Sequence, residues 1–147
     1  MSTFPTNTIV PSAVIDRLQR PLRSLRVSVI DRCDLRCRYC MPEERYAWLP
    51  KGDLLGADEI EQAVSAFAKL GVDRVRITGG EPLLRARLEE IVERIAHISS
   101  ISDLAMTTNG MQLAQRAADL AETPGVHTRT QPAARPARAA PPSQRRG

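Results

Sequence analysis

The feature that most constrains the fold of this chain is a regular alternation of β-branched segments with amphipathic helical segments. Ile60, Val64 and Phe67, for example, fall on one face at helical spacing. The expected strands span about 25–30, 72–78 and 101–107, and the expected helices about 57–70, 88–95 and 113–121. Such alternation predicts a parallel sheet with right-handed crossovers. We therefore expect an α/β fold whose site lies at the carboxyl ends of the strands.

Composition divides the chain into three parts. Residues 1–24 form an irregular N-terminal extension with a short helical piece near Ala13–Leu18, and residues 25–123 form the α/β core. Residues 124–147 hold five prolines, five alanines and five arginines with no acidic residue, which predicts a disordered tail. The net charge of +4 comes from this tail, because residues 1–123 carry 16 basic and 17 acidic residues. We therefore expect no specific nucleic-acid partner.

The sequence contains no run of 18 apolar residues, and its first residues lack the pattern of a secretory signal. We therefore expect no membrane association and a cytoplasmic location. In that compartment disulfides are disfavoured, and clustered cysteines more often bind metal.

Three cysteines, Cys33, Cys37 and Cys40, form a C-x3-C-x2-C motif directly after the first expected strand. Three thiolates can hold three irons of a [4Fe–4S] cube and leave the fourth iron open to another ligand. Structural zinc would need a fourth ligand, and the two histidines, His97 and His127, lie far along the chain. Buried inert cysteines would not be interleaved with charged residues. Iron–sulfur binding is thus favoured over both alternatives.

Two turns follow the next two expected strands. Thr78-Gly-Gly-Glu-Pro82 contains a glycine pair that permits close backbone approach, and Thr107-Thr-Asn-Gly110 has the composition of a turn or helix cap. Each alone could be an ordinary connection. Their shared position after successive strands predicts one common site with the cysteines.

The cysteine motif, Tyr39 before its last thiol and the Gly-Gly-Glu turn resemble the radical S-adenosylmethionine (SAM) superfamily. The resemblance implies a [4Fe–4S] cluster on the three cysteines and SAM on its open iron. It also implies that Tyr39 contacts the adenine and that Gly80 contacts SAM. The implied fold is the N-terminal half of a partial (β/α)6 TIM-like barrel.

A narrower resemblance, over about residues 14–123, is to the GTP 3′,8-cyclase family, lyases of molybdenum-cofactor biosynthesis. It rests on Asp31-Arg-Cys33, Arg36-Cys-Arg-Tyr-Cys-Met-Pro42 and Arg76-Ile-Thr-Gly-Gly-Glu-Pro-Leu-Leu-Arg85, among others. The resemblance implies contacts to GTP from four residues: Arg26, Arg74, Arg76 and Thr107. It also implies an electron donor such as flavodoxin or ferredoxin, and a homodimer.

The sequence departs from this family in three respects. Gln19 stands where the family usually has glycine, and Ile30 replaces a more common threonine. Only three βα units are visible, whereas a complete barrel commonly has about 250 residues, and the family's second three-cysteine cluster has no counterpart. We therefore expect a truncated product with little or no cyclase activity. Another radical SAM enzyme and a non-catalytic iron–sulfur fragment stay open as alternatives.

Overall fold

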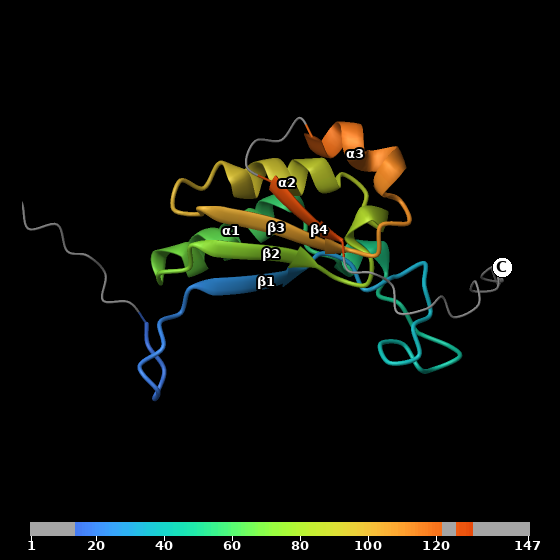
Figure 1. The fold of residues 1–147 in the computed structure, drawn as a ribbon, viewed down its shortest axis with the longest axis horizontal. Helices are drawn as coiled ribbons and strands as arrows, with labels where there is room; N and C mark the ends of the chain where they lie inside the picture. The colour runs from blue at the N-terminus through green and yellow to red at the C-terminus, as the bar shows by residue number, and fades with distance from the viewer. Residues whose placement is uncertain (1–13, 122–125, 131–147) are drawn as a thin grey trace, which may run out of the picture.

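The computed structural model describes residues 14–121 and 126–130 (Figure 1). Four parallel strands form one sheet in the order β1-β2-β3-β4. The strands are β1 (Ser24–Ser28), β2 (Arg74–Thr78), β3 (Asp103–Thr108) and β4 (Val126–Thr130). The helices are α1 (Ala57–Lys69), α2 (Leu88–Ala96) and α3 (Leu113–Ala121), with 3-10 turns η1 (Lys51–Asp53) and η2 (Pro82–Leu84). The predicted α/β fold with a parallel sheet is confirmed.

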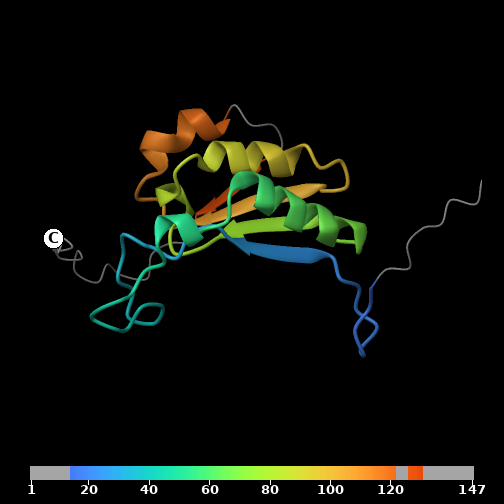
Figure 2. The same cartoon turned by 180° about the vertical axis from the view of Figure 1, so that it is seen from behind.

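The three α-helices cover the same face of the sheet, and none of the helices in the described ranges covers the other (Figures 1 and 2). Alternation along β2 explains this arrangement, because Val75 and Ile77 are buried while the alternate residues Arg74, Arg76 and Thr78 are not. Ile60 and Val64 of α1 and the apolar stripe of α2 pack with these strand residues into one core. The opposite face of the sheet, which no described helix covers, carries Arg26 and Arg76 on adjacent strands. We call it the helix-free face.

Two expectations at the ends of the core are wrong. Val126–Thr130, placed in the predicted disordered tail, forms β4 and pairs in parallel with β3. Its Val and Thr residues are good strand formers that the Pro- and Arg-rich surroundings obscured. The rest of the predicted tail, 124–125 and 131–147, lies outside the described residues, as do residues 1–13 of the predicted extension.

The helical piece expected near Ala13–Leu18 is a tight turn instead, over the part that the structure describes. An antiparallel bridge joins Ile15 to Pro21. The Asp16 carboxylate accepts the backbone N–H groups of Leu18 (2.8 Å) and Arg20 (3.0 Å). Aspartate competes with helix formation in this way because its side chain satisfies backbone donors locally. None of the helices in 14–121 is long and apolar enough to cross a membrane.

Gln19, at the tip of this turn, has a left-handed backbone with φ of 62°. A side chain is strained there, and glycine is not. We expect Gln19→Gly to stabilise the chain by about 0.5–1 kcal/mol, the relief of strain exceeding the greater freedom of the unfolded chain. Urea unfolding measures the change. The same substitution at exposed Gln62 in α1 should instead destabilise the chain by about 1 kcal/mol. Equal changes in stability at both positions would show that the backbone of Gln19 is not strained.

Candidate cofactor and nucleotide site

The carboxyl ends of β1, β2 and β3 bring three loops to one edge of the sheet. The cysteine loop follows β1, the Gly-Gly-Glu turn follows β2, and the Thr-Asn-Gly turn follows β3. A cavity of about 260 Å³ opens between them. Seven of the predicted site residues line it: Arg26, Cys33, Cys37, Tyr39, Cys40, Gly80 and Thr107.

Backbone hydrogen bonds close a turn between the last two cysteines of the loop. The Cys37 carbonyl accepts the N–H groups of Cys40 (2.9 Å) and Met41 (2.7 Å). Cys33 and Cys37 are half-buried and Cys40 is exposed. Partial burial raises the pKa of the Cys33 thiol, and the nearby charges of Asp34 and Glu81 add to the effect.

The three thiols fit the ligand set of an iron–sulfur cube. In a [4Fe–4S] cube each thiolate binds a different iron, so its ligands surround a larger object than one ion. All three thiols border the same cavity. Cys33, Cys37 and Cys40 can therefore hold a cube at the mouth of this cavity.

The Gly-Gly-Glu turn packs directly against the start of the cysteine loop. A Cβ on Gly79 would lie 2.3 Å from the Ile30 carbonyl oxygen, and one on Gly80 would lie 2.1 Å from that of Arg32. The Gly80 and Glu81 N–H groups donate to these same two carbonyls, at 2.7 and 2.8 Å. Since its donors are engaged, the turn can offer carbonyl oxygens to a ligand, and these suit an ammonium group.

Glu81, the third residue of this motif, is a buried acceptor that binds two loops. It is 1% exposed. Its Oε1 accepts the Leu83 N–H (3.0 Å) and the Thr108 hydroxyl (2.6 Å), and its Oε2 accepts the Asn109 N–H (2.7 Å). Glu81 therefore joins the turn after β2 to the turn after β3.

Arg36, between the first two cysteines, holds the cysteine loop to the segment that follows it. Its guanidinium carbon lies 5.3 Å from the ring centre of Trp48 and 5.7 Å from that of Tyr46, and the two rings stack on each other. Its Nη1 donates to the Cys33 carbonyl at 2.9 Å. This contact combines cation–π attraction with a hydrogen bond to the loop backbone, and a lysine ammonium lacks the planar face that lies against the two rings.

We expect Arg36→Lys to cost about 1 kcal/mol of loop stability. The emission of Trp48, the single tryptophan of the chain, should then shift to longer wavelength because its ring gains contact with water. Steady-state fluorescence measures the shift. Arg38→Lys, an exposed substitution two residues away, should leave the emission unchanged. Identical spectra for both variants would show that Arg36 does not hold the ring.

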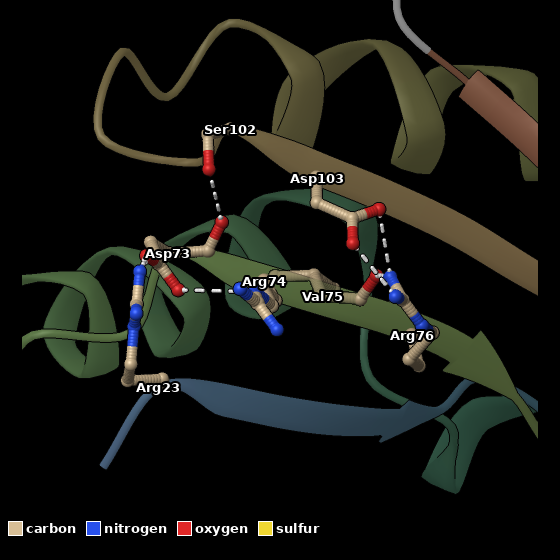
Figure 3. A network of polar contacts seen from close by, with 7 residues as sticks. All are labelled: Arg23, Asp73, Arg74, Val75, Arg76, Ser102 and Asp103. Carbon is tan, nitrogen blue, oxygen red and sulfur yellow. Dashed lines mark hydrogen bonds and ion pairs between the residues drawn. The ribbon is translucent and has the colours of Figure 1, made fainter. Parts of the chain in front are cut away.

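The predicted phosphate-binding arginines separate into two positions on the helix-free face. Arg26 lines the cavity, and its neighbour in register, Arg76, lies on the adjacent strand. The Arg76 fork binds both carboxylate oxygens of Asp103, at 2.9 and 2.7 Å (Figure 3). This hydrogen bonding raises the pKa of Arg76. Asp103 therefore sets the direction of the Arg76 guanidinium.

Arg74 lies outside this cluster. It is the first residue of β2, four residues before Thr78, which corresponds to about 13 Å along a strand. Its Nε lies 3.8 Å from Asp73, whose other carboxylate oxygen binds Arg23 (Figure 3). The Arg23 hydrogen bond lowers the pKa of Asp73. Arg74 thus belongs to an ion-pair network at the amino end of the sheet.

The site contains functional groups to which the sequence had assigned no role. These are Asp34, Glu81, Asp103 and Asn109. Glu81 and Asn109 stood within recognised motifs, so the sequence marked their positions. Asp103 carried no signal, because its partner is 27 residues away on another strand.

The family model of the radical SAM superfamily matches residues 27–129. This range contains the three cysteines and both turns, and the chain belongs to the radical SAM superfamily.

Within it, the chain is similar to proteins that are named GTP 3′,8-cyclase. It is 54% identical to that of Aquifex aeolicus over 110 residues, which are 74% of this chain and 34% of the relative. It is 55% identical to GTP 3′,8-cyclase 1 of Mycobacterium tuberculosis over 107 residues, 70% of this chain and 30% of the relative. With the Pelotomaculum thermopropionicum protein it shares 53% over 107 residues, 73% of this chain and 33% of the relative. The chain spans about a third of the length of these relatives.

Proposed function

We propose that this chain carries the cluster- and SAM-binding part of a GTP 3′,8-cyclase. The observation that carries the proposal is the single cavity that is bordered by three thiols, the Gly-Gly-Glu turn, Arg26 and Thr107. The cyclase names of relatives that are more than 50% identical support GTP as the substrate. The chemistry that a reduced cluster and SAM supply together is one-electron cleavage of SAM, which starts a radical reaction.

The residues of the chain have distinct roles in this proposal. Cys33, Cys37 and Cys40 hold the cluster. The Gly80 backbone binds the amino acid part of SAM, and Tyr39, exposed at the rim, covers the adenine. The thiols and the glycine turn share one cavity, so the two cofactors would be held in contact.

GTP would lie on the helix-free side, with Arg26 and Arg76 at its phosphates and Thr107 beside it. Guanidinium groups bind phosphate through paired hydrogen bonds, so Arg76 would exchange its paired bond to Asp103 for one to a phosphate. Arg74 stays a weaker prediction for GTP because it lies at the other end of β2.

We infer that the sheet is part of a partial (β/α)6 barrel. In barrels of parallel strands the helices form an outer ring and the opposite face of the sheet points inward. The one-sided helices and the charged helix-free face of this chain agree with that arrangement (Figure 2). A one-electron donor such as flavodoxin or ferredoxin would serve the cluster.

Anaerobic reconstitution tests the proposal. We expect about four irons and four sulfides per chain, as a [4Fe–4S] cube requires, and an electron paramagnetic resonance signal that SAM alters. Cys37→Ser should lose both the iron–sulfide content and the resonance signal. GTP should bind the loaded chain, and Arg26→Ala should weaken that binding while leaving the cluster intact. Zinc in place of iron, or a cluster indifferent to SAM, would overturn the proposal; SAM binding without GTP binding would indicate another radical SAM substrate.

A further inference from the structure

The three loops of the site meet at one residue, Asn109, whose side chain reaches the loop after β1 and whose backbone N–H donates to Glu81 of the turn after β2. Its Nδ2 donates to Asp34 Oδ1 at 2.7 Å and lies 3.8 Å from Cys33 Sγ. Asp34 and Cys33 belong to the loop after β1, whereas Asn109 follows β3, about 75 residues later, and is part-buried. A direct bond therefore joins the turn after β3 to the first cysteine and its neighbour.

Contacts within its own turn and to Glu81 orient the Asn109 side chain toward the cysteine loop. Its backbone N–H donates to buried Glu81, and its Oδ1 accepts the Met111 N–H at 2.9 Å. The preceding Thr108 hydroxyl donates to Glu81 and accepts the Gly110 N–H at 3.0 Å. Because Oδ1 must face the Met111 donor, Nδ2 must face Asp34. The amide orientation is thus set by the network.

We propose that Asn109 is a positioning residue that holds Cys33 at the cavity by tying Asp34 to the turn after β3, with Glu81 as its anchor. The inference rests on the proposed cluster site. It assigns a task to the Thr-Asn-Gly turn beyond that of a connection.

The hydrogen bond between Asn109 and Asp34 also affects the charge beside the Cys33 thiol. Asp34 Oδ1 lies 3.9 Å from Cys33 Sγ. The Asn109 amide engages this same oxygen and places an N–H donor near the sulfur. Groups around a cluster that donate to its sulfurs or alter local charge set its reduction potential and its retention. Loss of the amide should therefore affect both properties.

Asn109→Asp is the informative substitution, because it keeps the shape and the acceptor for Met111 but replaces the donor with a second carboxylate facing Asp34. In the reconstituted full chain we expect cluster iron to be lost to a chelator about 10- to 100-fold more readily, the usual cost of altering a partner of a metal ligand. The reduction potential should fall, because negative charge is added beside the cluster. A loss of global stability alone would not move the potential.

Asp34→Asn is the matched control, since an amide oxygen at position 34 can still accept from Asn109. It should retain iron as the unsubstituted chain does. The double variant Asn109→Asp with Asp34→Asn reverses the pair and restores both the bond and its net charge. We expect it to recover iron retention and most of the potential.

If Asn109→Asp fails to fold, Asp34→Ala serves as a second variant, because it removes the acceptor of the same hydrogen bond. We expect it to lose iron about 10-fold more readily than the unsubstituted chain. Asn109→Asp or Asp34→Ala chains that fold and retain iron normally would overturn the positioning role, as would a double variant no better than Asn109→Asp. In both cases an unsubstituted chain that still binds the cluster leaves the proposed function intact. An unsubstituted chain that binds no cluster would overturn both.

Discussion

Gly80→Ala should lower the free energy of unfolding by about 2–4 kcal/mol, because backbone atoms occupy the space that a methyl group needs. A Cβ there would lie 2.1 Å from the carbonyl oxygen of Arg32 and 2.6 Å from that of Asp31. These atoms cannot rotate away as a side chain can. Relief requires the start of the cysteine loop to move, so cluster loading should fall together with stability.

Gly52→Ala is the matched control for this substitution. No atom lies within 4 Å of a Cβ built on Gly52, which is in the exposed turn η1. The control should change stability by no more than about 0.5 kcal/mol. Urea unfolding of both variants, with iron content after reconstitution, gives the comparison. Equal stabilities for the two variants would mean that the turn after β2 does not press on the cysteine loop.

Glu81→Gln should cost about 2–4 kcal/mol although it preserves the shape of the side chain, because a buried donor is left facing another donor. Both carboxylate oxygens accept backbone N–H groups, Oε1 from Leu83 and Oε2 from Asn109. Whichever position the new NH2 group occupies, it meets one of these N–H groups. The Thr108 hydroxyl can reorient to accept, but a backbone amide cannot.

Glu44→Gln, in the exposed part of the loop after the cysteines, makes the same chemical change without burial and should alter stability by less than about 0.5 kcal/mol. Thermal or urea unfolding separates the two outcomes. Hydrogen exchange at the Asn109 amide adds a local measurement, since it should quicken in Glu81→Gln alone. Two variants of equal stability, with unchanged exchange, would show that Glu81 does not anchor the turn after β3.

Local patterns in the sequence were sufficient to predict most of the core. The apolar stripe through Ile60 and Val64 predicted α1, and the β-branched run around Val75 and Ile77 predicted β2. Both elements are decided by periodicity over a few residues. The parallel sheet then follows from their alternation, and it places all three motif loops at one edge.

Features that depend on distant partners could not be predicted in this way. The glycine pair correctly indicated close backbone approach, but its nearest neighbours are Ile30 and Arg32 of the chain itself. The pairing of Arg76 with Asp103 joins two strands, and β4 is a strand because β3 offers it an edge. Propensity carries no information on such partners.

The backbone bonds between the turn after β2 and the start of the cysteine loop have a consequence for how metal is acquired. Gly80 and Glu81 bind Ile30 and Arg32 through peptide groups alone, so this part of the site needs no ion to bring it together. Small zinc domains behave differently, since their ligands assemble only on metallation. We therefore expect this part of the site to be ordered before the cluster binds, so that cluster insertion costs little conformational entropy there. The far-ultraviolet circular dichroism of the apoprotein should accordingly match that of the holoprotein.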